Sequence, residues 1–153
     1  MPTLVLIRHA KAESLAASDH ARRLAPRGQA QAVALKAWLL DRALVADRAV
    51  VSTAARTRET WELAGSGPAE FDQRVYDAEP EDLREAIGET PVSVRVLVLV
   101  GHNPGVERLA WELDDSEAAR ALTSRGMPTG GVAVFDVPDW TLAGAVLREV
   151  YPP

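Results

Sequence analysis

The chain has 153 residues, 47% of them hydrophobic, and this size suits one globular domain, which we place at residues 1–153. Its net charge of -5 provides no overall positive field, so we expect neither a nucleic-acid partner nor a membrane partner. Cysteine is absent, which excludes a disulfide framework and a thiolate nucleophile. No apolar run reaches the length of about 18 residues that suggests a membrane span, and no secretory signal pattern begins the chain. We therefore expect a cytoplasmic protein.

The first apolar stretch ends in a potentially reactive pair. Residues Thr3 to Ile7 are apolar or β-branched, which indicates a strand buried on both faces of a central sheet. Arg8 and His9 follow at its carboxyl end, where open α/β sheets bind their ligands, and the small Ala10 leaves room for a ligand near the backbone. Taken alone, the segment also fits a strand followed by two solvated polar residues.

Helix and strand patterns alternate in the next segments. We expect the polar loop Lys11–Gly28 to lie over the end of the first strand. An amphipathic helix is predicted over 29–42, with these apolar residues packed on the sheet: Val33, Leu35, Trp38, Leu39 and Leu40. A strand over 49–51 runs into Ser52 and Thr53, where a hydroxyl is expected to cap a helix that carries Arg56.

The second half continues the alternation. Residues 71–76 lead to an acidic turn over 77–82, which opens a short helix. The most apolar segment, 94–100, predicts a central strand that runs into Gly101 and His102. Helices over 106–113 and 116–122, a turn over 127–131, a strand over 132–137, a hairpin near Pro138 and a strand over 145–150 complete the chain. The alternation predicts an α/β fold with a mostly parallel sheet.

Three predicted strand ends carry His9 with Arg8, Arg56, and His102, and the ends of a parallel sheet can converge. A neutral imidazole can attack phosphorus, while guanidinium groups bind phosphate oxygens through paired donors. A carboxylic acid must then protonate the leaving oxygen, and the acidic turn is where we look for it. The pattern therefore predicts phosphoryl chemistry.

These residues resemble a known family. Three motifs are similar to those of the histidine phosphatase superfamily, also called phosphoglycerate mutase-like: Arg8-His9-Ala10, Ser52-x-x-x-Arg56-x-x-x-Thr60 and Gly101-His102-Asn103-Pro104-Gly105. Three more are most similar to its SixA-type phosphohistidine phosphatase branch: Arg22-x-Leu24 before Gly28, Tyr76-Asp77-Ala78 and Met127-Pro128-Thr129. The motifs follow the family's order over almost the whole chain. The resemblance implies a three-layer α/β/α sandwich.

The resemblance also implies roles for the candidate residues. His9 would be the nucleophile that becomes phosphorylated, and Arg8, Arg22, Arg56 and His102 would surround the phosphate, with His102 also counted as catalytic. The cationic guanidinium groups favour an anion over a divalent metal ion, so a hydrolase that uses the histidines as metal ligands is disfavoured. We expect no metal and no cofactor.

The general acid is the least settled role. Asp77 is our choice, although relatives usually carry glutamate there, and Glu79 on the same turn is its rival. Ala10 is a second departure, because most of the superfamily has glycine at that position.

The expected substrate is a phosphorylated protein carrying phosphohistidine. No insertion is large enough to form a lid, and an open, arginine-lined site would admit a side chain of another protein. A small sugar phosphate or nucleotide is the alternative substrate, and a phosphate-binding or phosphoprotein-binding module without turnover is the alternative function.

We expect a monomer. His20 and Arg58 are predicted to be ordinary surface residues, and His102 taken alone also fits a turn histidine bonded to backbone.

Overall fold

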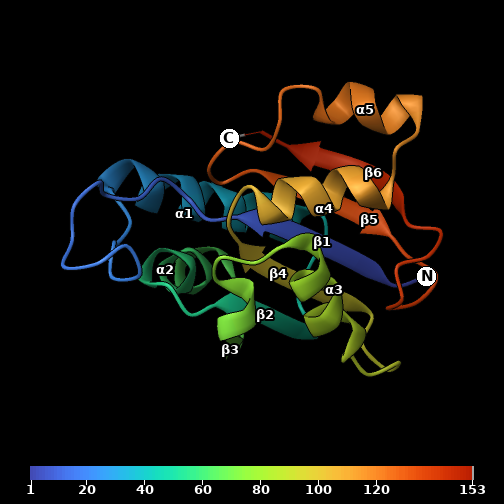
Figure 1. Ribbon diagram of the computed structural model, residues 1–153, viewed down its shortest axis with the longest axis horizontal. Coiled ribbons are helices and arrows are strands. Elements are labelled where there is room, and N and C mark those ends of the chain that lie inside the picture. Colours follow the sequence, from blue (N-terminus) through green and yellow to red (C-terminus); the bar gives the residue numbers. More distant parts are fainter. Residues whose placement is uncertain (153) are drawn as a thin grey trace.

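The computed structural model describes residues 1–152 and contains one central sheet (Figure 1). Its strands in chain order are β1 (Thr3–Arg8), β2 (Arg48–Ser52), β3 (Glu70–Asp72), β4 (Val96–Gly101), β5 (Val132–Asp136) and β6 (Val146–Tyr151). In space the order is β3-β2-β4-β1-β5-β6. The first four strands of this order run parallel, whereas β5 and β6 are antiparallel to their neighbours. The predicted mostly parallel sheet is confirmed.

Strand β1 occupies the middle of the sheet, between β4 and β5. Because side chains alternate along a strand, Leu4 and Leu6 belong to one hydrophobic core, and Val5 and Ile7 belong to a second core. All four side chains are fully buried. The prediction of a strand covered on both faces is therefore confirmed.

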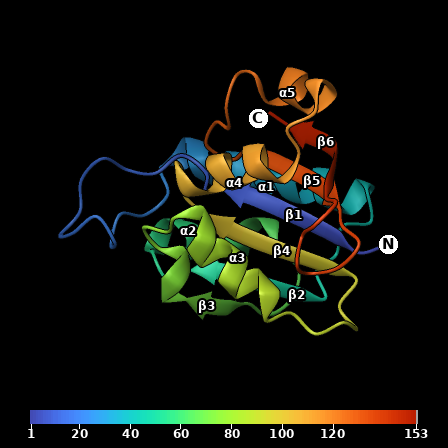
Figure 2. The same cartoon turned by 45° about the vertical axis from the view of Figure 1, so that its right-hand side comes forward.

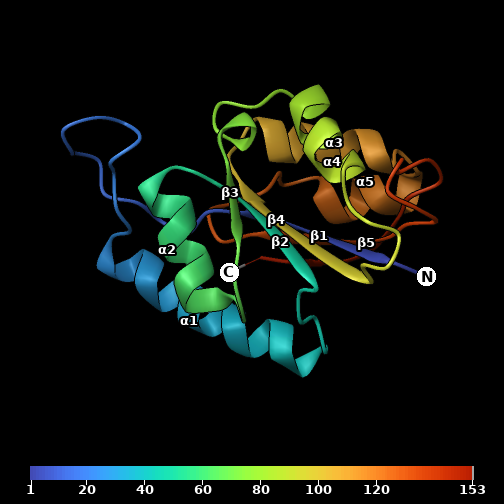
Figure 3. The ribbon, with the colours of Figure 1, turned by 90° about the horizontal axis from the view of Figure 1, so that it is seen from below.

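Helices cover both faces of the sheet (Figure 3). Helices α1 (Pro26–Asp41) and α2 (Ala55–Ala64) supply Leu35, Leu39 and Trp61 to the core that contains Val5. Helices α3 (Pro80–Gly88), α4 (Gly105–Leu113) and α5 (Glu117–Thr123) supply residues such as Leu83 and Leu109 to the other core. The chain thus has the predicted three-layer α/β/α sandwich. Within residues 1–152, no helix combines the length and apolar character needed to cross a membrane.

Three local predictions were wrong, and one strand was not predicted. Helix α1 begins at Pro26 rather than at 29, because proline at the first helical position has a backbone angle already suited to the helix. Val33 and Leu40 are exposed rather than packed on the sheet. Strand β3 was not predicted, since it is a short, exposed edge strand. No hydroxyl caps α2, whose N-cap residue is Ala54, because the Ser52 side chain points to other partners.

The connection between β1 and α1 projects from the edge of the sheet to which β1 and β4 point (Figure 2). We call residues 11–25 the β1–α1 loop. An isolated bridge between Ala12 and Leu24 closes its base. At Gly28, an added Cβ atom would lie 1.9 Å from the Lys11 carbonyl oxygen, so only glycine allows the start of α1 to pack this closely. The base of the loop is therefore held beside the end of β1.

The different burial of two aliphatic residues on α1 gives a stability test. Leu35 is 1% exposed and Val33 is 58% exposed. We expect Leu35→Ala to lower the free energy of unfolding by about 2–5 kcal/mol, through lost burial and a residual cavity. Val33→Ala should change it by less than about 0.5 kcal/mol. Urea denaturation of both variants measures the difference, and equal effects would contradict the packing of α1.

Candidate active site

His9 lies immediately after β1, and one hydrogen bond sets the protonation of its ring. Its Nδ1 atom is 2.7 Å from the backbone oxygen of Ala10. A carbonyl oxygen can only accept, so Nδ1 carries the proton and Nε2 retains its lone pair. Burial lowers the pKa of His9 to about 4; Arg56, Arg8 and Arg22 also lower it, and the Ala10 hydrogen bond only partly opposes this. At neutral pH the His9 ring is therefore uncharged, with a free lone pair on Nε2.

Backbone hydrogen bonds fix this position from three sides. His9 N donates to Gly101 O of β4 at 3.0 Å, while Gly130 N donates to His9 O at 2.9 Å. Ala10 N donates to the Thr60 hydroxyl of α2 at 3.0 Å. The backbone at His9 is therefore held by the sheet, by helix α2 and by the turn that precedes β5.

His102 follows β4 and lies next to His9, with the ring centroids 5.2 Å apart. Its Nε2 is 2.7 Å from the Ser52 hydroxyl, and its Nδ1 is buried with no hydrogen-bond partner among residues 1–152. Burial, together with the charges of His9 and Arg56, lowers the pKa of His102 to about 3. The alternative of a turn histidine bonded to backbone is not what the structure shows.

The three predicted phosphate-binding arginines all lie around His9, since each lowers its pKa. Arg56, in the first turn of α2, is 5% exposed, and Arg8 donates from Nη1 to Met127 O at 3.0 Å. The Nε atoms of Arg8 and Arg56 are buried and have no partner within residues 1–152. Arg22 comes from the β1–α1 loop and donates to Glu13 O at 2.9 Å. Buried donors without partners are costly, and an oxyanion could satisfy them.

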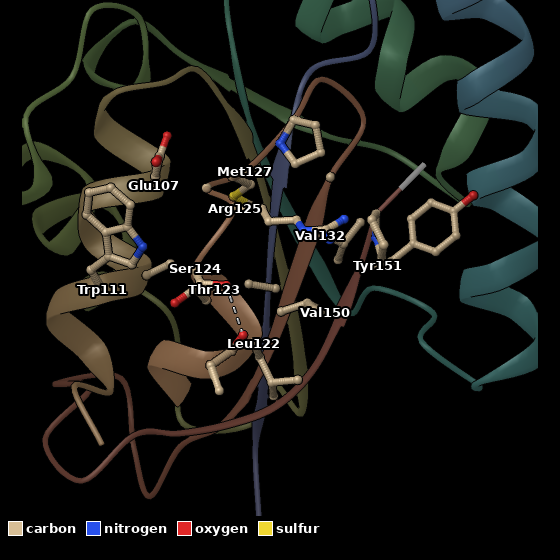
Figure 4. A pocket seen from close by; sticks show the side chains of 17 residues that line it. Glu107, Trp111, Leu122, Thr123, Ser124, Arg125, Met127, Val132, Val150 and Tyr151 are labelled. Atoms are coloured by element: carbon tan, nitrogen blue, oxygen red, sulfur yellow. Dashed lines mark hydrogen bonds between the residues drawn. The ribbon is translucent and has the colours of Figure 1, made fainter. Parts of the chain in front are cut away.

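The turn over 127–131 supports the arginine side of the site. Met127 O accepts from both Arg8 and Asn103, whose Nδ2 is 2.8 Å away. The same turn lines a mainly apolar cavity of about 490 Å³ with Trp111 and Leu122 (Figure 4). Within the described chain, neither catalytic-site histidine lines that cavity. Met127, whose backbone oxygen accepts from Arg8, connects the cavity to the arginine side of the candidate site.

The two candidate acids lie on a turn beside His102. Asp77 is exposed, has a φ of 54°, and follows Tyr76, whose ring meets the His102 ring edge-on at 5.5 Å. At Gly105, an added Cβ would lie 2.4 Å from Ala78 O, so this glycine lets the turn pack against the start of α4. The Glu79 carboxylate faces Arg108 at 3.7 Å, whereas Asp77 forms no ion pair among residues 1–152.

Sequence reasoning missed Asp19 and the contacts of two other residues. Asp19 lies between Arg22 and Arg56, and only its place in a basic loop could have drawn attention to it. Ser52 was interpreted as a possible helix cap but instead supports His102. His20 is exposed as predicted, yet its Nε2 is 2.8 Å from the Thr53 hydroxyl.

The predicted surface residue Arg58 is exposed, with its guanidinium over the Phe71 ring at 4.0 Å.

Residues 1–152 contain no group of three or more His, Cys, Asp or Glu side chains arranged to hold a metal ion. The charged groups nearest to the two histidines are guanidinium groups and the Asp19 carboxylate. The charge beside the two histidines is therefore mainly positive.

The lowered histidine pKa values predict how stability depends on pH. Below pH 6.5 the unfolded chain binds protons at His9 and His102. The folded protein protonates His9 only near pH 4 and His102 only near pH 3. The unfolded state therefore binds more protons below pH 6.5. As pH decreases from 6.5, the contribution of His9 to stability falls until about pH 4 and that of His102 until about pH 3. Imidazole NMR titration of the folded protein should show both rings neutral at pH 6. A midpoint near 6.5 for either ring would contradict the site geometry.

Comparisons with known proteins agree with this arrangement. The sequence pattern of the histidine phosphatase superfamily (branch 1) matches residues 4–95. An uncharacterised protein of Mycobacterium tuberculosis is 36% identical over 138 residues, which cover 86% of this chain and 87% of that protein. A solved structure from Nakamurella multipartitia, named a putative phosphohistidine phosphatase SixA, is 34% identical and has a TM-score of 0.91, covering 99% of this chain and 96% of that chain.

The protein histidine phosphatase SixA complexed with tungstate shares the fold, with a TM-score of 0.82 at 22% identity, covering 97% of this chain and 95% of that chain. The expected resemblance is therefore confirmed in both sequence and structure. This chain belongs to the histidine phosphatase superfamily, in its SixA-type branch.

Proposed function

We propose that this protein is a phosphatase that hydrolyses phosphomonoesters or phosphoramidates through phosphorylated His9, with protein phosphohistidine as its preferred substrate. The observation that carries the proposal is the neutral His9 ring, whose Nδ1 proton is donated to Ala10 O while Nε2 keeps its lone pair beside three arginines. This combination provides a nucleophile and a set of anion-binding donors in one buried pocket.

In the first step, the Nε2 lone pair of His9 attacks phosphorus. The Nε2–P bond forms as the bond from phosphorus to the leaving oxygen or nitrogen breaks, and the leaving atom takes a proton. The buried donors that lack protein partners, Nε of Arg8, Nε of Arg56 and Nδ1 of His102, would bind the phosphoryl oxygens. For His102 to donate from Nδ1, its Nε2 must accept the Ser52 hydroxyl proton, and the 2.7 Å contact permits this.

In the second step, water attacks phosphorus and the Nε2–P bond breaks, while a proton of the water passes to the carboxylate that gave up its proton in the first step. The electron pair of this bond returns to Nε2, which regenerates the neutral ring with its proton still on Nδ1. The low pKa of His9, about 4, makes the ring a good leaving group as well as a nucleophile that is free at neutral pH. The same burial therefore serves both halves of the reaction.

Asp77 is the proposed general acid for the leaving group. It lies on the turn that follows Tyr76, beside His102, and its carboxyl group is exposed and outside any ion pair within residues 1–152. Glu79 is the weaker candidate because Arg108 lies 3.7 Å from its carboxylate. With phosphohistidine as substrate, the leaving imidazole can itself be protonated, so the acid should matter less there.

Access to the site supports a protein substrate. The side chains of Arg22 and Asp19 are 27% and 54% exposed, so the pocket can be reached from solvent beside the β1–α1 loop. A phosphorylated imidazole projecting from another protein could enter there. The similarity to SixA structures supports the same choice.

A side-by-side substrate screen tests the proposal. Phosphohistidine protein, sugar phosphates, nucleotides and an aryl phosphate are incubated with the protein in the presence of a chelator, and released phosphate is measured. We expect the highest kcat/KM for phosphohistidine protein. His9→Ala should abolish turnover while cooperative unfolding is retained, and the exposed-histidine control His20→Ala should keep most activity.

A small metabolite that is orders of magnitude better, with phosphohistidine protein untouched, would overturn the substrate assignment. Turnover by His9→Ala would overturn the nucleophile. Phosphate binding without turnover or His9 labelling on any substrate would indicate a binding module instead.

The choice of acid gives a separate prediction. Asp77→Asn should slow hydrolysis of alkyl phosphates, which need a protonated leaving oxygen, by about 10²-fold or more, and slow aryl phosphates much less. Glu79→Gln is the matched variant on the same turn and should behave like the wild type. If Glu79→Gln instead slows alkyl phosphates more than aryl phosphates, and Asp77→Asn leaves both rates unchanged, Glu79 is the general acid. Steady-state kinetics with both substrate types distinguishes the two outcomes.

A further inference from the structure

Asp19 binds the same arginines that are expected to bind the phosphoryl group. Its carboxylate accepts hydrogen bonds from the Tyr76 hydroxyl at 2.6 Å, from Arg56 Nη2 at 3.1 Å and from Arg22 Nε at 3.1 Å. Its backbone oxygen accepts from Arg56 Nη1 at 2.8 Å. Both terminal nitrogens of Arg56 thus bind one residue of the β1–α1 loop.

The charges explain why an acid residue lies there. Arg56 is 5% exposed, and a buried guanidinium is costly without a counter-charge. The hydrogen bond from Tyr76, followed by the contacts with Arg56 and Arg22, holds the pKa of Asp19 far below its usual range. Asp19 therefore stays ionised at neutral pH and balances part of the positive charge around His9.

The balance has a consequence for oxyanion binding. Three arginines and one carboxylate leave a net charge of about +2 near His9. This charge is equal in size and opposite in sign to that of a fully ionised phosphoryl group. Without the carboxylate, the pocket would hold a phosphate dianion more tightly, including the phosphate released by hydrolysis. A phosphatase needs that product to leave.

We propose that Asp19 is an internal counter-anion that limits the affinity of this site for phosphate, because its carboxylate offsets the positive charge of Arg22 and Arg56 beside the position of the phosphoryl group. It is a positioning residue that acts through the two arginines and does not touch the reacting atoms. This inference rests on the proposed function of the same pocket. A residue that merely anchored the loop would have the opposite effect, since its loss would disorder the arginines and weaken phosphate binding.

The test is phosphate affinity in Asp19→Asn, which preserves the size of the side chain and an oxygen that can accept from Tyr76. Binding of inorganic phosphate is measured by calorimetry at pH 7.5 and constant ionic strength, together with product inhibition of aryl phosphate hydrolysis. We expect about tenfold tighter binding, the effect of removing one nearby like charge. Asp115→Asn removes the same charge at an exposed position and should change binding by less than about twofold.

Weaker or unchanged phosphate binding by Asp19→Asn would overturn the inference. If this variant does not fold, Asp19→Ser is the second test, and loss of folding in both would show that Asp19 is a structural anchor instead. Calorimetry requires no turnover, so the two proposals can fail separately. If Asp19→Asn binds phosphate more tightly but the wild-type protein hydrolyses no substrate, the phosphatase proposal is rejected and the counter-anion role is retained. If the wild-type protein hydrolyses its substrate but Asp19→Asn binds phosphate as the wild type does, the phosphatase proposal is retained and the counter-anion role is rejected.

Discussion

The hydrogen bond from His9 Nδ1 to the Ala10 backbone oxygen is the constraint on which the chemistry of this site depends. It determines which ring nitrogen holds the proton, and therefore which one can form a bond to phosphorus. This hydrogen bond joins neighbouring residues, but its geometry depends on distant parts of the chain. Gly101, Gly130 and Thr60 hold the backbone of residues 9 and 10 through hydrogen bonds. Three other parts of the chain thus hold the proposed nucleophile in place.

Parallel strands explain how these parts meet. Strands β1, β2 and β4 deliver His9, Ser52 and His102 to the same edge of the sheet, and α2 follows with Arg56. Arg22 and Asp19 then approach from the β1–α1 loop. Burial keeps both histidines uncharged, while the arginines keep the pocket positive. The site therefore combines positive charge with an unprotonated His9, which is what the proposed attack on a phosphoryl group requires.

Sequence patterns predicted the mostly parallel sheet and the convergence of His9, His102 and Arg56, since these follow from short-range periodicity and from strand direction. The three layers were implied by the resemblance to the family. The patterns did not predict the partners of Asp19, because its bonds to Arg56 and Tyr76 span 37 and 57 residues and depend on how an irregular loop folds. Ser52 was misread for the same reason, since its partner His102 lies 50 residues away. Edge strand β3 has no buried face to leave a period-2 signal.

The site of phosphorylation on His9 is the most direct test of this account. Phosphoenzyme is trapped by rapid quenching at alkaline pH, where phosphorylated nitrogen is stable, and the phosphohistidine isomer is identified by ³¹P NMR after digestion. Because Nδ1 carries the proton that Ala10 O accepts, the phosphoryl group should be found on Nε2 of His9 alone. Phosphate on Nδ1, on another histidine, or on a serine or threonine hydroxyl would contradict it.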